Sequence, residues 1–290
     1  MNSAPEPARP TGHDKVAFIT GASRGIGAES AVALARAGYR VAITARTLSD
    51  GESHDHVGSS QALPGSLEST AAAVRAAGGE ALCLRGDILE PESLVGAAQQ
   101  ALAHFGRIDL LFNNAVYQGT GNLEPLLEVS DEQLWNIYRA NIFTPLALVR
   151  AVLPGMLARR SGTLFNMVSH SAFANPPAAA DKGGWGFAYP SSKAALSRMV
   201  GSLRAEHPDC GLRAMNLEPG LVVTEVMRLA GIDEEVMARF RPCSPAAIAA
   251  VVAWLADNEP LPEWQPKEVL RCPAIAKELN LLDAPSLLEN

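Results

Sequence analysis

Tyr189 and Lys193 stand four residues apart in the segment Tyr-Pro-Ser-Ser-Lys, and together their side chains could move a proton. On a helix this spacing is about one turn, so both side chains share a face with Cβ atoms roughly 5–6 Å apart. A phenol ordinarily ionises near about pH 10, and an ammonium group held beside it lowers that pKa. The pair therefore predicts an acid–base device, although a bare Tyr-x-x-x-Lys pattern is common by chance.

A glycine-rich segment, Thr-Gly-Ala-Ser-Arg-Gly-Ile-Gly over residues 20–27, follows an apolar run and opens an amphipathic one. Gly21, Gly25 and Gly27 let a backbone turn tightly and approach a pyrophosphate, which then lies at the positive N-terminus of the helix. The spacing differs from the commonest Gly-x-Gly-x-x-Gly fingerprint. The segment predicts a strand–turn–helix unit that binds the phosphates of a dinucleotide.

Composition limits the classes of protein to consider. The chain has 290 residues, a hydrophobic fraction of 48% and a net charge of −7 without any basic block, so a nucleic-acid or anionic-membrane surface is not expected. The four cysteines are scattered, and the first fourteen residues lack an apolar signal core, which favours a cytoplasmic location. No apolar run is expected to span a membrane. His54 and His56 have no completing ligands nearby, so no metal site is expected.

The elements that must position these residues alternate between apolar strands and amphipathic helices. This alternation predicts an α/β fold: a single doubly wound Rossmann-type domain with a parallel sheet and helices on both faces. Strands are expected at residues 16–20, 40–45, 81–85, 110–113, 162–168 and 212–217, with one more near 268–272. Helices are expected at residues 25–37, 67–77, 91–105, 131–159, 189–207 and 245–257.

Three domain segments are expected: a flexible tail at 1–14, a dinucleotide-binding catalytic domain at 15–258, and an extension at 259–290 packed on that domain. Gly38 is expected to end the first helix. Ser130 with Gln133 predicts a capping box, and Ser244 before a proline predicts another helix start. The segments 47–66 and 174–186 are longer than a minimal α/β unit needs, so they are interpreted as functional loops.

Six motifs occur in an order that carries a family resemblance. They are Thr20-Gly-x-x-x-Gly-Ile-Gly27, Asn113-Asn-Ala115, Asn141, Ser169, Tyr189-x-x-x-Lys193 and Pro219-Gly-x-x-x-Thr224. Together they resemble the short-chain dehydrogenase/reductase family, in its single-domain branch, from about residue 15 to 257. The usual closing Asp-Gly-Gly strand is missing, and Val116 stands where similar sequences usually have glycine.

The resemblance implies a nicotinamide cofactor. An acidic residue at the end of the second strand would accept from the ribose of NAD, but this strand ends in Ala45-Arg46, and Arg24 lies in the glycine turn. Two guanidinium groups suit a 2′-phosphate, so NADP(H) is expected, with NAD(H) possible; alternatively, Arg46 points to solvent. Asp87 either meets the adenine or caps a helix. The other implied contacts are Gly21, Ser23, Gly25, Ile26, Gly27, Asn114, Ala115, Tyr189, Lys193, Pro219, Gly220, Val222 and Thr224.

The same resemblance implies catalytic roles. Tyr189 exchanges the proton of the substrate oxygen, and Lys193 binds the nicotinamide ribose and keeps the tyrosine acidic. Ser169 donates to the substrate oxygen, with Ser171 as a rival because the interval to Tyr189 is unusually long. Asn141 anchors a proton-relay water, or is merely a solvated asparagine.

The implied substrate is a carbonyl compound or secondary alcohol, and the apolar surroundings favour a largely apolar small molecule. Its walls are expected at Val116–Tyr117, 171–185 and 221–240, the last as a lid rather than a plain core helix. The alternatives are a catalytically silent NADP(H) sensor or an enzyme of related fold that reduces enoyl groups or dehydrates. A homodimer or homotetramer is expected through the helices at 131–159 and 189–207.

Overall fold

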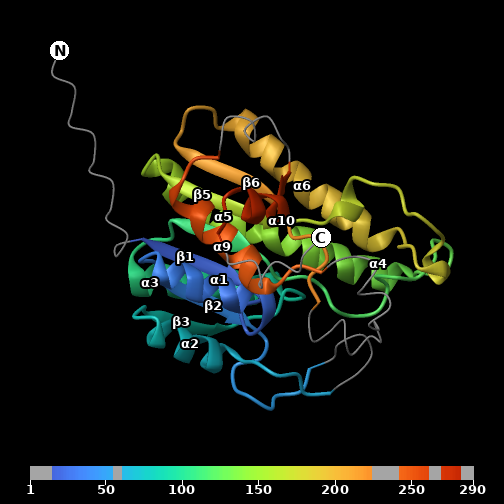
Figure 1. Ribbon diagram of the computed structural model, residues 1–290, viewed down its shortest axis with the longest axis horizontal. Coiled ribbons are helices and arrows are strands. Elements are labelled where there is room, and N and C mark those ends of the chain that lie inside the picture. The colour runs from blue at the N-terminus through green and yellow to red at the C-terminus, as the bar shows by residue number, and fades with distance from the viewer. Residues whose placement is uncertain (1–14, 55–60, 224–241, 261–268, 282–290) are drawn as a thin grey trace.

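A central parallel sheet organises the protein (Figure 1). The computed structural model describes residues 15–54, 61–223, 242–260 and 269–281. Within this part the sheet has seven strands in the order β3-β2-β1-β4-β5-β6-β7, all paired in parallel. Their bounds are β1 Val16–Thr20, β2 Arg40–Ala45, β3 Ala81–Arg85, β4 Leu110–Asn113, β5 Gly162–Met167, β6 Leu212–Glu218 and β7 Leu270–Arg271.

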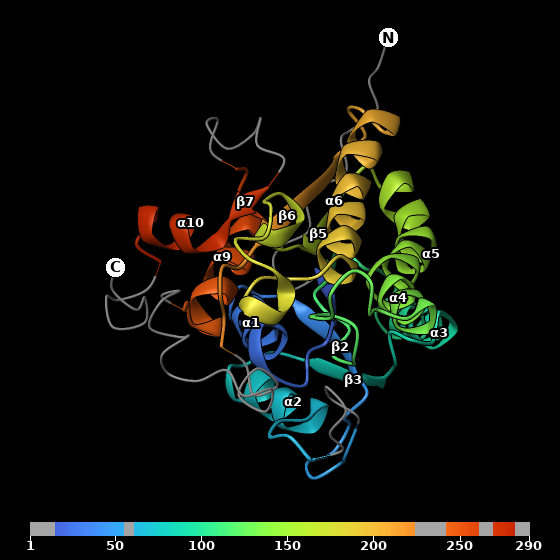
Figure 2. The same cartoon turned by 90° about the vertical axis from the view of Figure 1, so that its right-hand side faces the viewer.

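Helices cover both faces of the sheet (Figure 2). One face carries α1 (Gly25–Arg36), α2 (Leu67–Ala76), α9 (Pro245–Asp257) and α10 (Cys272–Glu278). The other carries α3 (Pro91–Phe105), α4 (Asp131–Tyr138), α5 (Thr144–Ala158) and α6 (Ala188–Glu206). Alternate residues of β1 enter the two cores, with Ile19 on the first face and Phe18 on the second. The predicted doubly wound α/β fold is confirmed.

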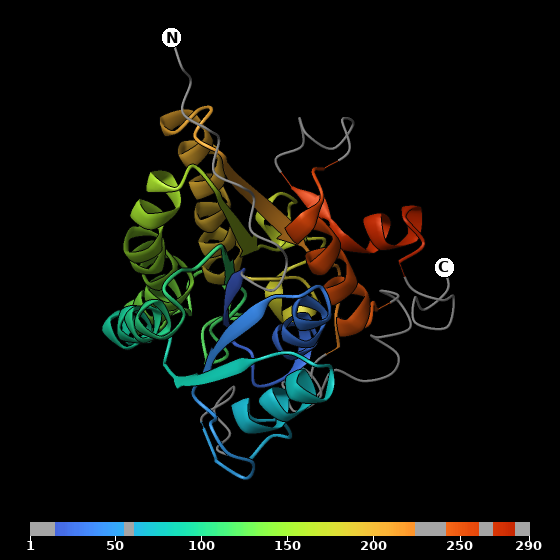
Figure 3. The same cartoon turned by 90° about the vertical axis from the view of Figure 1, so that its left-hand side faces the viewer.

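The C-terminal elements return to the N-terminal unit. In Figure 3 the orange helix α9 lies beside the blue helix α1, and the two pack along much of their lengths. Buried Leu34 of α1 and Val252 of α9 belong to one core cluster. Helices α1 and α9, far apart in the sequence, therefore share one hydrophobic core.

Local sequence signals account for the helix ends. Ser130 Oγ accepts from Gln133 N at 3.2 Å while Gln133 Oε1 accepts from Ser130 N at 2.9 Å, which confirms the capping box. Ser244 Oγ accepts from the third residue of α9, as predicted. Gly38 has a φ of +88° just after α1, a conformation that favours glycine.

The predicted helix over 131–159 is interrupted. A π-helical segment, η2 (Arg139–Phe143), separates α4 from α5. A π-bulge widens one turn of a helix and often marks a functional position. Asn141 lies within this turn, so the mid-helix asparagine occupies an altered backbone and not a regular α-helix.

One prediction about membranes is wrong as stated. The continuous helical stretch Asp131–Ala158 is long and apolar enough to cross a bilayer by length and composition. In the structure α5 packs on α3 and on the strands β4 and β5, and Leu148, Val149 and Val152 are buried there. Core helices with such packing meet the same test of length and composition.

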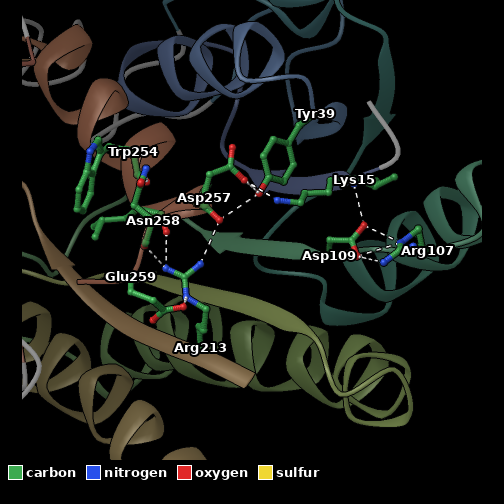
Figure 4. A network of polar contacts seen from close by, with 12 residues as sticks. Lys15, Tyr39, Arg107, Asp109, Arg213, Trp254, Asp257, Asn258 and Glu259 are labelled. Carbon is green, nitrogen blue, oxygen red and sulfur yellow. Dashed lines mark hydrogen bonds and ion pairs between the residues drawn. The ribbon is translucent and has the colours of Figure 1, made fainter. Parts of the chain in front are cut away.

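A polar network closes the amino ends of the strands, opposite the candidate site (Figure 4). Tyr39 Oη donates to Asp257 Oδ1 at 3.0 Å, and Lys15 Nζ pairs with the same carboxylate at 2.6 Å. Asp109, almost buried, accepts from Val16 N at 2.9 Å. These bonds tie β1 to α9 and to the start of β4, so this end of the sheet is assigned a structural role.

Candidate active site

The carboxyl ends of the central strands bring most of the predicted residues together. The glycine turn follows β1, Asn114 and Ala115 follow β4, Ser169 lies beyond β5, and Pro219 and Gly220 follow β6. The strand order reverses between β1 and β4, and ligands of open α/β sheets bind in the crevice at such a point.

The glycine turn is too tight for side chains. Gly21 and Gly25 have φ values of +68° and +56°. A Cβ on Gly27 would lie 2.3 Å from the carbonyl oxygen of Gly21, and a Cβ on Gly21 would lie 2.8 Å from Ala115 Cα. Glycine is therefore required by contacts within the protein as well as by any ligand above the turn.

Asn114 and Thr20 lock this turn to the end of β4. Thr20 Oγ1 accepts from the N–H groups of Asn114 and Ala115, each at 3.0 Å. Asn114 Nδ2 donates to the carbonyl oxygens of Thr20 at 2.9 Å and Gly21 at 3.2 Å. Asn114 and Ala115 thus lie beside the turn, as predicted, and they hold its shape.

The amino end of α1 fits a phosphate group. Arg24 precedes the helix in an extended conformation, and its side chain does not cap the N–H groups of the first turn. Those N–H groups and the helix dipole favour an anion at this end. Together with the glycine cradle, they form the phosphate-binding arrangement expected for a dinucleotide.

The Arg24 side chain bonds to the 47–66 insertion, a role that the sequence analysis missed. Its guanidinium donates to the carbonyl oxygens of Pro64 and Gly65, each at 2.9 Å, and to those of Leu63 and the hydroxyl of Thr47 at 3.4 and 3.3 Å. Arg24 therefore fastens the end of the 47–66 insertion to the glycine turn. This bonding differs from the expectation that its guanidinium converges with that of Arg46 on one phosphate.

A second arginine, Arg85 at the end of β3, also lies at this edge of the sheet. It donates to the carbonyl oxygen of Arg46 at 2.8 Å and pairs with both carboxylate oxygens of Glu52 at 2.8 and 2.9 Å. The hydrogen bond from Arg85 lowers the pKa of Glu52 to about 2. Arg46 itself lies at the end of β2, half-buried, where the adenosine end of a dinucleotide is expected.

Asp87 shapes a turn between β3 and α3. Its Oδ1 accepts from Leu89 N at 2.9 Å, and Glu90 occupies the position that precedes α3. Asp87 is therefore not the helix cap that was one of the two alternatives. A contact between Asp87 and adenine stays a prediction.

Tyr189 and Lys193 lie in the first turns of α6, as their spacing predicts. Lys193 Nζ lies 5.9 Å from the centroid of the Tyr189 ring and donates to the carbonyl oxygen of Met167 at 2.8 Å. Lys193 is only 2% exposed, and this burial lowers its pKa to about 8. Its ammonium group has further donors to offer a ligand.

The expectation that Lys193 lowers the pKa of Tyr189 is wrong for this structure. Burial of the phenol raises its pKa, a hydrogen bond with Ser169 opposes that shift, and the charge of Glu218 adds to it. Burial prevails because it penalises the charged phenolate. The phenol is accordingly protonated at neutral pH, the state that a proton donor requires.

Ser169 and Ser171 are joined and do not act separately. Their hydroxyl oxygens are 3.0 Å apart, and Ser171 N donates to Ser169 Oγ at 3.3 Å at the start of the short helix η3 (His170–Ala172). Of the two serines, Ser169 is the one whose hydrogen bond counteracts the rise in the pKa of Tyr189. This electrostatic link favours Ser169 over Ser171 as the residue next to the reacting oxygen.

Asn141 is buried, which contradicts the alternative of a solvated asparagine. Its Oδ1 accepts from Tyr117 N at 3.0 Å, and its Nδ2 donates to Ser192 Oγ at 3.0 Å. The side chain thus links the loop after β4 to α6 next to Lys193. Its role in a water relay stays a prediction.

Three asparagines in register hold α6 against the sheet. Asn113, Asn166 and Asn216 are neighbours across β4, β5 and β6. Asn113 donates to Asn166 at 2.9 Å, while Asn166 and Asn216 donate to the carbonyl oxygens of Leu196 at 3.3 Å and Ser197 at 2.9 Å in α6. The sequence analysis assigned no role to Asn216. Its signal would have been an asparagine close to the carboxyl end of each of three neighbouring strands.

An apolar hollow of about 430 Å³ lies at the start of α6, and none of the described residues that line it is charged. Its lining includes Ser171 and the two residues that follow Tyr189 in the chain, but neither Ser169 nor Tyr189 itself. The predicted wall at 171–185 lines this hollow, but Val116–Tyr117 does not. The lining residues are Pro125, Leu126, Ser171, Ala174, Pro176, Ala179, Ala180, Trp185, Gly186, Phe187, Pro190 and Ser191. Pro125 and Leu126 were missed because nothing local marks their loop.

The remaining predicted site residues lie partly inside and partly outside the described part of the chain. Gly220 has a φ of +68°, Val222 is buried, and Ser23 is buried within the glycine turn. Thr224 and most of the expected lid at 221–240 lie outside the described residues. In the described part of the chain no group of three His, Cys, Asp or Glu side chains could hold a metal ion.

Comparison with known proteins identifies the family of the chain. The profile of the short chain dehydrogenase family matches residues 15–235. A short chain dehydrogenase of Pseudocercospora fijiensis is 33% identical over 73% of this chain, which spans 61% of that relative's length. An uncharacterized oxidoreductase of Methylorubrum extorquens is 30% identical over 88% of this chain and 95% of its own. A metagenomic short-chain oxidoreductase, solved in complex with NADP, is 29% identical with a TM-score of 0.65, covering 86% of this chain and 93% of its own.

Proposed function

Because the chain belongs to the short chain dehydrogenase family, we propose that it is an NAD(P)-dependent oxidoreductase that interconverts a carbonyl group and a secondary alcohol. The observation that carries this proposal is the pairing of Tyr189 with the buried Lys193, whose Nζ lies 5.9 Å from the centroid of the phenol ring at the start of α6.

NADP(H) is the proposed cofactor, and NAD(H) is a possible substitute. The glycine cradle and the uncapped start of α1 suit the pyrophosphate, and Arg46 at the end of β2 suits a 2′-phosphate. The similar metagenomic enzyme solved with NADP supports this choice. When bound, the reduced nicotinamide supplies the hydride.

The side chains of the protein supply the proton and the electrostatic support. Tyr189 donates its hydroxyl proton to the substrate oxygen in reduction and accepts it back in oxidation. Ser169 holds that oxygen by a hydrogen bond that strengthens as negative charge develops. Lys193 is buried, and its ammonium group donates to the carbonyl oxygen of Met167 and presents its remaining N–H donors to the cofactor ribose. Asn141 positions Ser192, the residue next to Lys193.

A largely apolar ketone, aldehyde or secondary alcohol is the proposed substrate. A hollow of about 430 Å³ has the size of a pocket for a small organic molecule. Since none of the described residues that line it is charged, a polyanionic substrate would lose its hydration without a compensating partner among them.

The test is a panel of apolar and charged carbonyl compounds assayed with NADPH and NADH. Two matched variants locate the substrate, because Leu126 lines the hollow while its neighbour Leu127, 97% exposed, does not. Leu126→Asp is expected to lower kcat/KM for apolar ketones at least about tenfold, the loss of roughly 1.4 kcal/mol of apolar contact. Leu127→Asp is expected to leave it unchanged. Turnover confined to charged substrates, or equal effects of both variants, would contradict the proposal.

We also propose a homodimer or homotetramer assembled through the α4–α5 and α6 side of the molecule. An exposed aromatic pair, Trp135 and Phe143, lies on this side with ring centroids 5.4 Å apart. Light scattering coupled to gel filtration is expected to give a dimer or tetramer mass, and Trp135→Asp to reduce it. A monomer at micromolar concentration would refute this assembly.

A further inference from the structure

Glu218, the last residue of β6, is a buried carboxylate that the roles assigned above do not use. Its side chain is 4% exposed. Oε1 accepts from the N–H of Gly220 at 2.7 Å, and Oε2 accepts from Arg271 Nε at 3.3 Å. Burying a carboxylate is costly unless it is paired and hydrogen-bonded, and here both conditions are met.

Strand geometry places this carboxylate on the same face of the sheet as the catalytic helix. Side chains alternate along a strand, and Met215 and Leu217 of β6 enter the core under α1 and α9. Ala214 enters the opposite core, and Asn216 bonds to the carbonyl oxygen of Ser197 in α6. Glu218 continues the second series, so it points to the side of α6.

The position along the sheet is also that of the active site. Met167 pairs with Leu217, and Val168 N donates to the carbonyl oxygen of Leu217 at 2.9 Å. Glu218 is therefore level with the segment from Met167 to Ser169. Met167 accepts a hydrogen bond from Lys193, whose ammonium group lies 5.9 Å from the Tyr189 ring.

The partner of Glu218 comes from the C-terminal segment beyond the region matched by the family profile, which ends at residue 235. Arg271 of β7 is the register neighbour of Glu218. The next residues strengthen this link, because a Cβ on Gly220 would lie 3.1 Å from Pro273 Cγ in α10. The C-terminal strand and helix are thus seated on the turn that follows β6.

We propose that Glu218 is a positioning residue of the active site: its carboxylate fixes the Pro219–Gly220 turn and places a negative charge, partly balanced by Arg271, against the acid–base tyrosine. The proposal rests on the function assigned to Tyr189 above. A negative charge disfavours the phenolate and so keeps the phenol protonated for carbonyl reduction. In agreement, the charge of Glu218 raises the pKa of Tyr189.

The groups that face this carboxylate come from several elements. Arg271 from β7 is the cation bonded to it, and its side chain is 69% exposed. Tyr189 from α6 and Cys272 at the start of α10 both respond to its charge. Burial is the main reason that the pKa of Cys272 is raised, so this thiol is neutral and adds no charge at neutral pH.

Two substitutions with opposite expected effects test the proposal. Glu218→Gln keeps an acceptor for Gly220 N but removes the charge, so the pKa of Tyr189 is expected to fall. Arg271→Gln leaves the carboxylate less balanced, so the same pKa is expected to rise, by a smaller amount because Arg271 is largely exposed. The readout is the near-ultraviolet absorbance of tyrosinate against pH, taken as the difference between each protein and its Tyr189→Phe counterpart.

Circular dichroism over the same pH range checks that each protein stays folded, and the surface variant Arg271→Gln serves if Glu218→Gln does not fold. A lower pKa of Tyr189 in Glu218→Gln supports the proposal. If only Arg271→Gln folds, a higher pKa of Tyr189 in that variant supports it. The proposal is overturned if the titration midpoint of Tyr189 is the same as in the wild-type protein, or if it shifts in the same direction in both variants. Either result indicates that Glu218 and Arg271 form a purely structural ion pair. The titration needs no substrate, so its failure is distinct from a failure of the proposed enzymatic activity.

Discussion

Replacing Gly27 by alanine tests the cofactor site through a single methyl group. The added Cβ would lie 2.3 Å from the carbonyl oxygen of Gly21 and 2.7 Å from Asn114 Nδ2. The nearest of these atoms belongs to the backbone, so the turn itself must move. Gly96, in the middle of α3, is a matched control because an added Cβ there meets nothing within 4 Å.

The magnitudes follow from the two environments. Forcing a methyl group into a packed site costs about 1–3 kcal/mol, and part of this strain falls on the turn that would hold the pyrophosphate. Since each 1.4 kcal/mol is about a factor of ten, NADPH binding is expected to weaken roughly tenfold or more. Gly96→Ala is expected to stabilise the fold by about 0.5–1 kcal/mol, because alanine favours a helix interior.

Calorimetric titration with NADPH and urea unfolding measure both effects. Gly27→Ala should bind NADPH more weakly and unfold at lower urea concentration, whereas Gly96→Ala should bind normally and unfold at higher concentration. Wild-type NADPH affinity in Gly27→Ala would refute the assignment of this turn to the cofactor.

Three further predictions concern the buried lysine, the amino-end network and cofactor choice. Because burial lowers the pKa of Lys193 from 10.5 to about 8, the folded state binds fewer protons than the unfolded state between these values. The free energy of unfolding of the wild-type protein should therefore rise with pH across this window, by on the order of 3 kcal/mol relative to Lys193→Met. If urea unfolding gives the same difference between the two proteins at every pH, the result would argue against a buried ammonium. Tyr39→Phe removes a bond to Asp257 and should cost about 0.5–1.5 kcal/mol of unfolding free energy without changing NADPH affinity, and a large loss of binding would contradict its structural role. Arg46→Ala should weaken NADPH at least about tenfold more than NADH, and equal losses in titrations with both would show that Arg46 does not bind the 2′-phosphate.

Much of the fold was predictable because its signals are local. The bounds of β1, β2, β3 and β4 agree with the sequence prediction, since short buried apolar runs lie between glycines and polar turns. Gly38 and the capping pair Ser130–Gln133 fixed helix ends for equally local reasons. Tyr189 and Lys193 were found because their spacing matches one helical turn.

The features that escaped prediction depend on distant parts of the chain. The π-helical turn at 139–143 is a shift in backbone hydrogen bonding that hydrophobic periodicity does not reveal. The direction of the pKa shift of Tyr189 was wrong because burial is produced by several elements that no local pattern encodes. Arg24 bonds to carbonyl oxygens about forty residues away in the sequence. The role proposed for Glu218 depends on Arg271, which β7 brings beside it.

The central claim is that the Tyr189 hydroxyl transfers the proton, and Tyr189→Phe tests it most directly because this change removes one oxygen and keeps the ring. With a ketone turned over by the wild-type protein, the variant is expected to lose about 10²–10⁴-fold in kcat while NADPH binding, followed by its fluorescence, stays within about twofold. Turnover at the wild-type rate would contradict the account, because an enzyme that uses another acid does not need this hydroxyl.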